Sequence, residues 1–494
     1  MAHVILPDPV DPGFNTLARE QMARWHIPGI SIGVVHGYEK YFAQYGYARL
    51  DDTPMTEHSL FPVSGTTKGF TAAIMATVIQ DPQKVPVQSP VRWDTPIATR
   101  LRADFVLSDE HATAVTTIED ALCHRIGLPN LQFAEVLRDP GLILEDLIRQ
   151  LRYIPLAHDP DHRHFEYSNE SYQVISHLLQ RVTQLPLEEI LCRIIWRPLG
   201  MASTSLSVDG VKRDVELSRR LVQGYTWDAR SQQYIDEDYS YYAASSGANA
   251  VVSSVSDYVK WLQCLLLEEK TLSPAVHHTI KFPRIVVKSE TQFDHFLTPE
   301  KPYHLYTVGW FLDSYRGEPL YWHTGSQHGA AVIAGFLPSL QFGFTIMATR
   351  TDLMYQSVTR SLVAAAQEAP SPWDYVRPKL PPSVPLHKYE GIYQHPGFGQ
   401  ITLVIYNADL YSDLNDRICR SLIKLNHLSA QFFVAEQLTT GGRWEGTFGT
   451  PLVEFEVTLY MLVERMAIYV PAFPGGKIWF ARVIDGGPCK DLRY

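Results

Sequence analysis

Gly65 and Lys68 are three residues apart at the predicted start of a helix. At this spacing two side chains lie on one helical face, and a serine followed by a lysine would form the Ser-x-x-Lys pair of acyl-transfer sites. In such a pair serine attacks the acyl carbon, and a partly desolvated lysine removes its proton. Because the first position is glycine, the chain keeps the predicted base and lacks the predicted nucleophile.

The glycine has three interpretations. The chain is an engineered form whose serine was replaced, or a natural protein that kept the pocket and lost covalent chemistry. Alternatively, Ser64 is the nucleophile, because four residues before Lys68 is also close to one helical face. The main chain of Ser64 would not place both oxyanion donors around its own acyl carbon, which weakens the third interpretation.

A tyrosine and an asparagine follow much later, in the stretch Tyr167-Ser168-Asn169. The phenol of Tyr167 can act as a base or pass on a proton. The amide of Asn169 can orient the substrate or Lys68. The tyrosine thus supplies a proton-transfer group, and the asparagine an orienting group, beside the lysine of an acyl-transfer site.

A third element ends a predicted strand, in Trp322-His323-Thr324-Gly325-Ser326. The backbone N–H of Ser326 would be an oxyanion donor, together with the N–H at the nucleophile position. Gly325 belongs to the same substrate-binding stretch, and His323 would form a polar or cationic wall of the pocket.

These residues must be positioned by one sheet with helices on its faces, because strands are predicted at both ends of a long helical region. A helix is expected over 14–25, and helical patterns dominate from about residue 66 to about residue 270. Another helix is expected over 356–367. The expected strands cover 30–35, 41–46, 308–312, 320–323, 331–336 and 342–347.

The composition changes near residue 370, where prolines become frequent. The segment 371–385 is too rich in proline for a helix or a central strand and is predicted to be a semi-rigid linker. Short β-rich segments follow it at regular spacing, which is typical of a small antiparallel barrel. The predicted domains are therefore 1–370, an α+β sandwich, and 386–494, a β-barrel.

The net charge of −10 and the pI near 6.0 argue against nucleic acid or an anionic membrane as the main partner. No segment has the uninterrupted apolar length of a membrane span, and the N-terminus lacks the pattern of a secretory signal. The five cysteines are few and widely spread, without a Cys-x-x-Cys pair. The sequence thus predicts a cytoplasmic protein with reduced thiols.

In this order the elements resemble the serine β-lactamase and penicillin-binding-protein-like superfamily, in its class C β-lactamase, esterase and D-aminopeptidase branch. The resemblance covers roughly residues 14–367, and the tail around Tyr389 resembles the lipocalin-like barrel of many relatives. It implies a β-lactamase/transpeptidase-like antiparallel sheet flanked by helices, plus the barrel. The stretches that carry it, besides the three elements above, are 27–31, 45–48, 117–129, 197–204 and 246–261.

The resemblance also implies a set of site residues. The catalytic positions are Gly65, Lys68, Tyr167 and His323, and the substrate-binding residues are Ser64, Asn169, Gly325 and Ser326. Besides Gly65 at the nucleophile position, two further departures from the family pattern stand out. His323 replaces the lysine of β-lactamases, which makes antibiotic hydrolysis an unexpected task, and Arg125-Ile126 replaces a Thr-Ser pair.

The leading hypothesis is an esterase, amidase, lactonase or small-molecule acyltransferase that takes a small-molecule acyl substrate. If the glycine is natural, Lys68 and Tyr167 would work without a covalent intermediate. They would either activate a water molecule or remove a proton from the carbon beside a carbonyl group. The alternative is a catalytically silent protein that binds a ligand. No cofactor and no metal are predicted, since the close histidine pairs 162/164 and 277/278 have no pattern of further ligands beside them. Substrate and oligomeric state stay open.

Overall fold

We describe the protein from a computed structural model. The described residues are 12–131, 142–158, 164–228, 231–239, 246–269, 271–287, 303–315, 317–327, 329–350, 380–414, 422–439, 442–443, 451–458, 461–470, 477–484 and 487–488.

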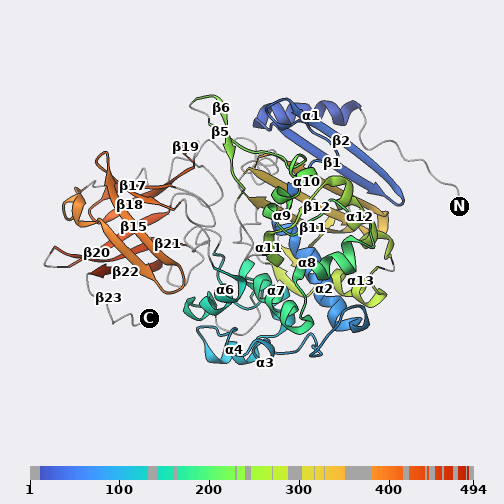
Figure 1. Cartoon of the computed structure of the whole chain (residues 1–494), viewed down its shortest axis with the longest axis horizontal. Helices are drawn as coiled ribbons and strands as arrows, with labels where there is room; N and C mark the ends of the chain where they lie inside the picture. The colour runs from blue at the N-terminus through green and yellow to red at the C-terminus, as the bar shows by residue number, and fades with distance from the viewer. Residues whose placement is uncertain are drawn as a thin grey trace.

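The larger part of the described chain is built on one antiparallel sheet (Figure 1). Its strand order is β3-β2-β1-β13-β12-β11-β10-β9-β8, so the first strands of the chain lie beside the last strand of this region. This confirms the predicted assembly of one sheet from distant segments. The strands are β1 Gly29–His36, β2 Glu39–Arg49, β3 Thr53–Pro54, β8 Ile285–Val287, β9 His304–Tyr306, β10 Phe311–Tyr315, β11 Glu318–Gln327, β12 Ala330–Leu337 and β13 Phe342–Ala348.

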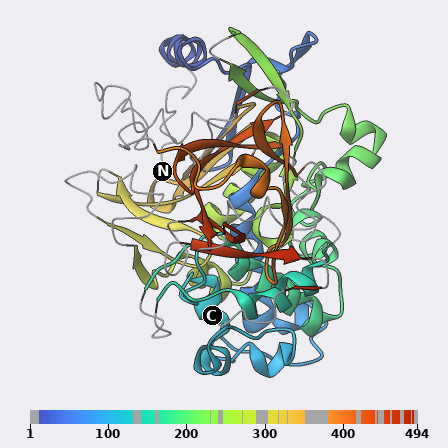
Figure 2. The same cartoon turned by 90° about the vertical axis from the view of Figure 1, so that its left-hand side faces the viewer.

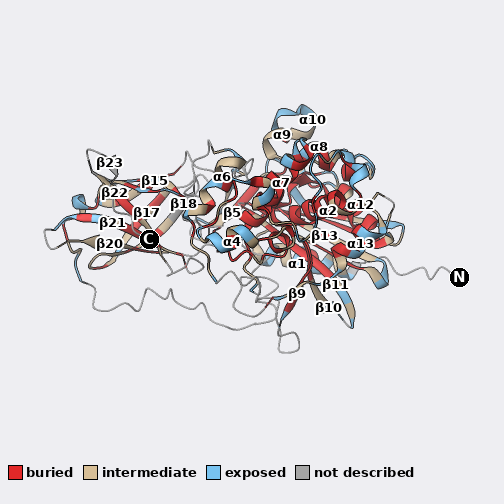
Figure 3. Ribbon diagram, turned by 90° about the horizontal axis from the view of Figure 1, so that it is seen from below, coloured by how far each residue is buried: buried red, intermediate tan, exposed pale blue. Residues whose placement is uncertain are grey.

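Alternate residues of β1 face two different helices, as the pleat of a strand requires. Ile30, Ile32 and Val34 share an apolar cluster with residues of helix α1, Pro12–Trp25. The opposite face meets helix α12, Val255–Leu267, which comes so close that a β-carbon on Gly33 would lie 2.7 Å from a methyl carbon of Val259. Figure 3 shows in red how the buried residues concentrate where the helices pack on the sheet.

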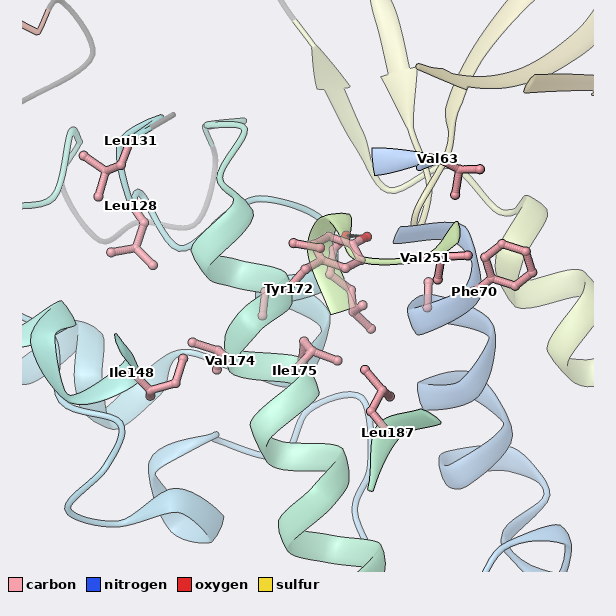
Figure 4. Packing of buried hydrophobic residues seen from close by; sticks show 14 of the residues in the cluster. Val63, Phe70, Leu128, Leu131, Ile148, Tyr172, Val174, Ile175, Leu187 and Val251 are labelled. Carbon is pink, nitrogen blue, oxygen red and sulfur yellow. Dashed lines mark hydrogen bonds between the residues drawn. The ribbon is translucent and has the colours of Figure 1, made fainter. Parts of the chain in front are cut away.

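Helix α2, Thr67–Gln80, is the central helix, because its side chains from Thr67 to Val78 are all buried. A helix that is apolar nearly all round belongs in the middle of a core. Helix α7, Asn169–Thr183, runs beside it, and Tyr172 and Ile175 point from α7 into the space between the two (Figure 4). The remaining helices are α3 Ala98–Leu101, α4 Glu110–Val115, α5 Ile118–Leu122, α6 Leu144–Gln150, α8 Leu187–Leu191, α9 Val208–Arg213, α10 Val215–Ser218, α11 Ser246–Asn249 and α13 Pro274–Lys281.

The predicted helical region therefore forms, although two small sheets interrupt it. One pairs β5, Gly224–Asp228, with β6, Gln233–Glu237, and the other pairs β4, Phe61–Pro62, with β7, Val252–Ser253. No helix in the described part of the chain is long and apolar enough to cross a membrane.

The departure at Arg125 has a structural reason. Thr117 and Asp120 form a capping box at the start of α5, and the guanidinium of Arg125 lies 2.8 Å from Asp120 and 3.0 Å from Glu119. Ile126 is buried in the core. Both residues thus stabilise the helix and the turn that follows it.

The C-terminal strands form a closed eight-stranded barrel, because β14 pairs with β15 on one side and with β22 on the other. Figure 2 turns the barrel toward the viewer. Its interior is filled by rings such as Tyr389, Phe433 and Phe455, as in other small barrels. The barrel strands are β14 Gly391–His395, β15 Gly399–Tyr406, β16 Asp409–Asp413, β17 Leu422–Ser429, β18 Phe432–Thr439, β20 Leu452–Val457, β21 Val463–Tyr469 and β22 Lys477–Ile484, with β19 Gly442–Arg443 and β23 Gly487–Pro488 at its rim.

The predicted helix over 356–367 and most of the predicted linker lie outside the described residues. The domain boundaries stay a prediction for that reason. The three described cysteines, Cys123, Cys192 and Cys264, are free thiols, and Cys419 and Cys489 are outside the described part.

The core of the larger part can be tested with two leucine-to-alanine substitutions. Leu265 on α12 is fully buried, whereas Leu340 is half exposed. We expect Leu265→Ala to lower the free energy of unfolding by roughly 2–5 kcal/mol, through lost burial and a cavity. Leu340→Ala is the matched control and should change it by less than about 0.5 kcal/mol. Scanning calorimetry of both variants measures the difference, and equal effects would contradict the assignment of α12 to the core.

Candidate active site

The start of α2 lies directly against strand β11. A short 3-10 turn, Ser64–Thr66, leads into the helix. On the strand, a β-carbon on Gly325 would lie 2.1 Å from the carbonyl oxygen of Val63. Only glycine allows two backbones to approach this closely, so Gly325 sets the distance between the turn and the strand.

Gly65 is the point on which the predicted site residues converge. A β-carbon placed there would lie 3.3 Å from Tyr167 Oη and 3.3 Å from His323 Cε1. The same carbon would be only 2.6 Å from the carbonyl oxygen of Thr324, which is too short for a carbon–oxygen contact. In this conformation a side chain at position 65 therefore requires the turn and the strand to move apart.

Lys68 is fully buried one turn along α2. Its Nζ donates hydrogen bonds to Asn169 Oδ1 at 2.7 Å and to the carbonyl oxygen of Ala248 at 3.2 Å. The ammonium also lies 4.8 Å from the ring centre of Tyr167 and 5.6 Å from that of Tyr172, where each ring attracts a cation. The lysine is thus held by two distant parts of the chain, the segment 167–172 and the segment at Ala248.

The structure brings Asn169 to Lys68. Of the two roles considered for its amide, to orient the substrate or the lysine, the geometry favours the second. Tyr167 precedes helix α7 and is almost entirely buried. Its ring therefore stays close to Lys68 on one side and to His323, at 6.2 Å between ring centres, on the other.

His323 is a neutral ring in this site. Its Nδ1 lies 2.6 Å from the carbonyl oxygen of Thr324, and because a carbonyl only accepts, Nδ1 carries the proton. Burial, reinforced by the nearby Lys68 ammonium, lowers the pKa of His323 to about 3. His323 was predicted to be either a polar or a cationic wall of the pocket, and a neutral ring fits the polar alternative. The lone pair of Nε2 is buried, and among the described residues it has no hydrogen-bond partner.

Ser64 is turned toward the strand. Its backbone has φ of +43°, an uncommon conformation for a residue with a side chain. Its hydroxyl donates to the carbonyl oxygen of Ser326 at 2.8 Å. This hydrogen bond connects the 3-10 turn to β11 and engages the hydroxyl that a nucleophilic Ser64 would need.

Three contributors to the site were not among the predicted residues. They are the carbonyl group of Ala248, the ring of Tyr172 and the buried ring of His124, whose centre lies 4.5 Å from that of Tyr167. Ala248 and His124 lie within stretches that carry the family resemblance, so the sequence contained a signal for both. Nothing in the sequence marks Tyr172 apart from other core aromatics.

One group of potential metal ligands occurs among the described residues, formed by Asp104, Glu145 and His177. The guanidinium of Arg149 lies between the two carboxylates, 2.8 Å from Asp104 and in contact with Glu145. His177 Nε2 is 3.2 Å from the same Asp104. Arg149 pairs with both carboxylates, so the group forms an ion-pair network that joins α6 and α7 to Asp104, in the segment after α3.

The comparison with protein families agrees with this geometry. The family model described as beta-lactamase matches residues 14–368. The chain belongs to the β-lactamase family. A similar protein is the unguisins hydrolase ungD′ of Aspergillus campestris, which is 31% identical over 471 residues, 88% of this chain and 85% of that protein.

Solved structures of this family share the fold. The octameric penicillin-binding protein homologue of Pyrococcus abyssi has a TM-score of 0.55 and 17% identity, over 94% of this chain and 99% of that one. The D-amino acid amidase of Ochrobactrum anthropi, in complex with L-phenylalanine amide, has a TM-score of 0.56 and 21% identity, over 70% of this chain and 94% of that one. At these identities the likeness concerns the fold alone.

The low pKa of His323 predicts how stability depends on pH. The unfolded chain binds a proton at this residue near its ordinary pKa of about 6.5, whereas the folded protein binds it only near 3. Stability is therefore lost as pH falls below about 6.5, by up to about 1.4 kcal/mol per pH unit. In His323→Gln the free energy of unfolding should fall less steeply between about pH 6 and about pH 4, by about 1.4 kcal/mol per pH unit.

Urea unfolding across this pH range measures the slope, with the substitution of an exposed histidine, His111→Gln, as control. An unchanged pH dependence in His323→Gln would show that the ring is protonated in the folded protein.

Proposed function

We propose that this member of the β-lactamase family hydrolyses an amide or ester bond of a small molecule, and that it does so without a covalent acyl-enzyme. The observation that carries the proposal is the convergence of Tyr167 and His323 on Gly65, beside a buried lysine. Hydrolysis is also the activity in the name of the relative with 31% identity, the unguisins hydrolase.

In this proposal Lys68 is a fixed cation. It donates to Asn169 and Ala248, and its charge favours the phenolate form of the neighbouring Tyr167. The phenolate accepts a proton from water while the water oxygen attacks the carbonyl carbon. The same proton passes from Tyr167 to the leaving nitrogen or oxygen as the bond to carbon breaks, which returns the phenolate.

The developing oxyanion needs hydrogen-bond donors. The predicted ones are the backbone N–H groups of Gly65 and Ser326. The lone pair of His323 Nε2 is a further acceptor, suited to an N–H group of the substrate or to the attacking water. With a pKa near 3 this nitrogen accepts a hydrogen bond at neutral pH and does not take up the proton.

A natural loss of the serine agrees best with this geometry. An engineered Ser→Gly change would leave room for the missing β-carbon, but the carbonyl oxygen of Thr324 is 2.6 Å from that point. Ser64, the other candidate, donates its hydroxyl to Ser326. Water is therefore the proposed nucleophile.

Hydrolysis can be tested on p-nitrophenyl acetate and on p-nitroanilides of L- and D-amino acids. We expect turnover by the unchanged chain. Lys68→Ala and Tyr167→Phe should each lower kcat by about 10²–10⁴-fold, because proton transfer contributes that much to such reactions. A Lys68→Ala variant as active as its parent would exclude the proposed mechanism. Lys281→Ala, at the lysine that ends α13 and pairs with Glu268, is the control.

The absence of a covalent intermediate can be tested by intact mass after incubation with p-nitrophenyl acetate. We expect no adduct on the unchanged chain, since neither Gly65 nor the engaged Ser64 is available. Gly65→Ser should also form little adduct unless β11 moves, because its β-carbon meets Thr324.

Other results would separate the alternatives. A stable adduct at residue 65 of Gly65→Ser would indicate a disabled but serviceable acyl-transfer site, and an adduct at Ser64 of the unchanged chain would make Ser64 the nucleophile. Binding of amides or esters without turnover in either form would favour the silent binding protein.

A further inference from the structure

His124 lies just after the C-cap of helix α5, in a conformation that favours glycine. Its φ is +56°, and the residue after Cys123, the C-cap of α5, commonly adopts this left-handed geometry. Glycine takes it without steric cost, and asparagine does so more readily than most residues. A bulky imidazole at this position has a backbone cost, which suggests that its side chain is needed for something other than ending the helix.

His124 accepts hydrogen bonds from both chain neighbours of Tyr167. Its carbonyl oxygen accepts the backbone N–H of Glu166 at 2.8 Å. Its ring Nδ1 accepts the backbone N–H of Ser168 at 3.2 Å. Two hydrogen bonds from one residue therefore fix the chain immediately before and immediately after the tyrosine.

The imidazole ring also contacts the tyrosine itself. The ring centres of His124 and Tyr167 are 4.5 Å apart with an angle of 35° between the planes. Tyr172 and Tyr306 enclose the imidazole at 5.1 Å each. The ring is fully buried, so it has little freedom to leave this arrangement.

Because Nδ1 accepts a hydrogen bond, the neutral ring carries its proton on Nε2. Burial, together with the nearby Lys68 ammonium, holds the pKa of His124 well below its ordinary value and keeps the ring neutral. Among the described residues Nε2 has no hydrogen-bond partner. A buried donor without a partner has a free-energy cost, which is a second sign that the ring is retained for its Nδ1 contact and its packing.

We infer that His124 is a positioning residue, which fixes the phenol of Tyr167 in the site by holding the backbone on both sides of it and packing against its ring. This inference rests on the proposed role of Tyr167 in hydrolysis. Its structural part, the control of the position of Tyr167, stands apart from that role and can be measured separately.

The experiment compares His124→Asn with His124→Gly. Both substitutes suit the left-handed backbone, but only asparagine offers an acceptor, Oδ1, at the place of Nδ1. Equal thermal midpoints of the two variants by circular dichroism would confirm that both fold. The position of Tyr167 is followed by the NMR resonance of its ¹³Cζ atom in tyrosine-labelled full-length protein, assigned with Tyr167→Phe. Function is followed by the pH–rate profile for p-nitrophenyl acetate.

We expect His124→Asn to keep the Tyr167 resonance near its original position and kcat within about threefold of the parent. His124→Gly should shift the resonance and lower kcat by about 10²-fold with little change in KM, since a displacement of about 1 Å in a reacting group has an effect of that size. The apparent pKa of the pH–rate profile should also move in His124→Gly and not in His124→Asn.

An unmoved Tyr167 resonance and an unchanged rate in His124→Gly would overturn the inference. An equal loss of kcat in His124→Asn and His124→Gly would also overturn the inference, because the hydrogen-bond acceptor that only asparagine keeps would then have no effect. If the unchanged chain does not hydrolyse the ester at all, the proposed function fails, while the NMR comparison still decides whether His124 positions Tyr167.

Discussion

The burial of one ammonium group organises the site. Lys68 lies on a helix whose other side chains are almost all in the core, and a charge in such surroundings is unfavourable unless polar atoms surround it. Asn169 from α7 and the carbonyl group of Ala248 from α11 provide those atoms, and the faces of Tyr167 and Tyr172 complete the enclosure. The positions of α7 and α11 relative to α2 are therefore coupled to the same group that the proposed chemistry uses.

A second constraint acts at the glycines. Gly65 and Gly325 allow the turn before α2 and strand β11 to come closer than side chains would permit. This approach leaves the carbonyl oxygen of Thr324 only 2.6 Å from the point where a β-carbon at position 65 would lie. It also holds Ser64 against Ser326. A side chain at position 65 would therefore require a change in these backbone contacts, and the proposed function places a water molecule beside Gly65 instead.

Much of the fold could be predicted because its signals are local. The segments 30–35 and 41–46 were predicted to be two strands joined by a turn, and they pair as β1 and β2. The β-rich segments beyond residue 386 close into a barrel. The convergence of Lys68, Tyr167 and His323 was predicted because their motifs occur in the same order along the chain as in the family. The state of the site had no local signal. The neutrality of His323 depends on burial and on Lys68, which is distant in the chain.

By itself the sequence determined which groups the chain possesses: a lysine without its serine, a tyrosine, a histidine in place of a lysine, and an order of elements that belongs to the β-lactamase family. Only the tertiary structure decided what state those groups are in. Protonation, tautomer and the room for a β-carbon are set by desolvation and by contacts within a few ångströms. Such contacts join residues that lie far apart in the chain, as between Gly65 and Thr324 or between His124 and Ser168. Residue types and spacing cannot specify them, because they depend on how closely the packed elements approach one another.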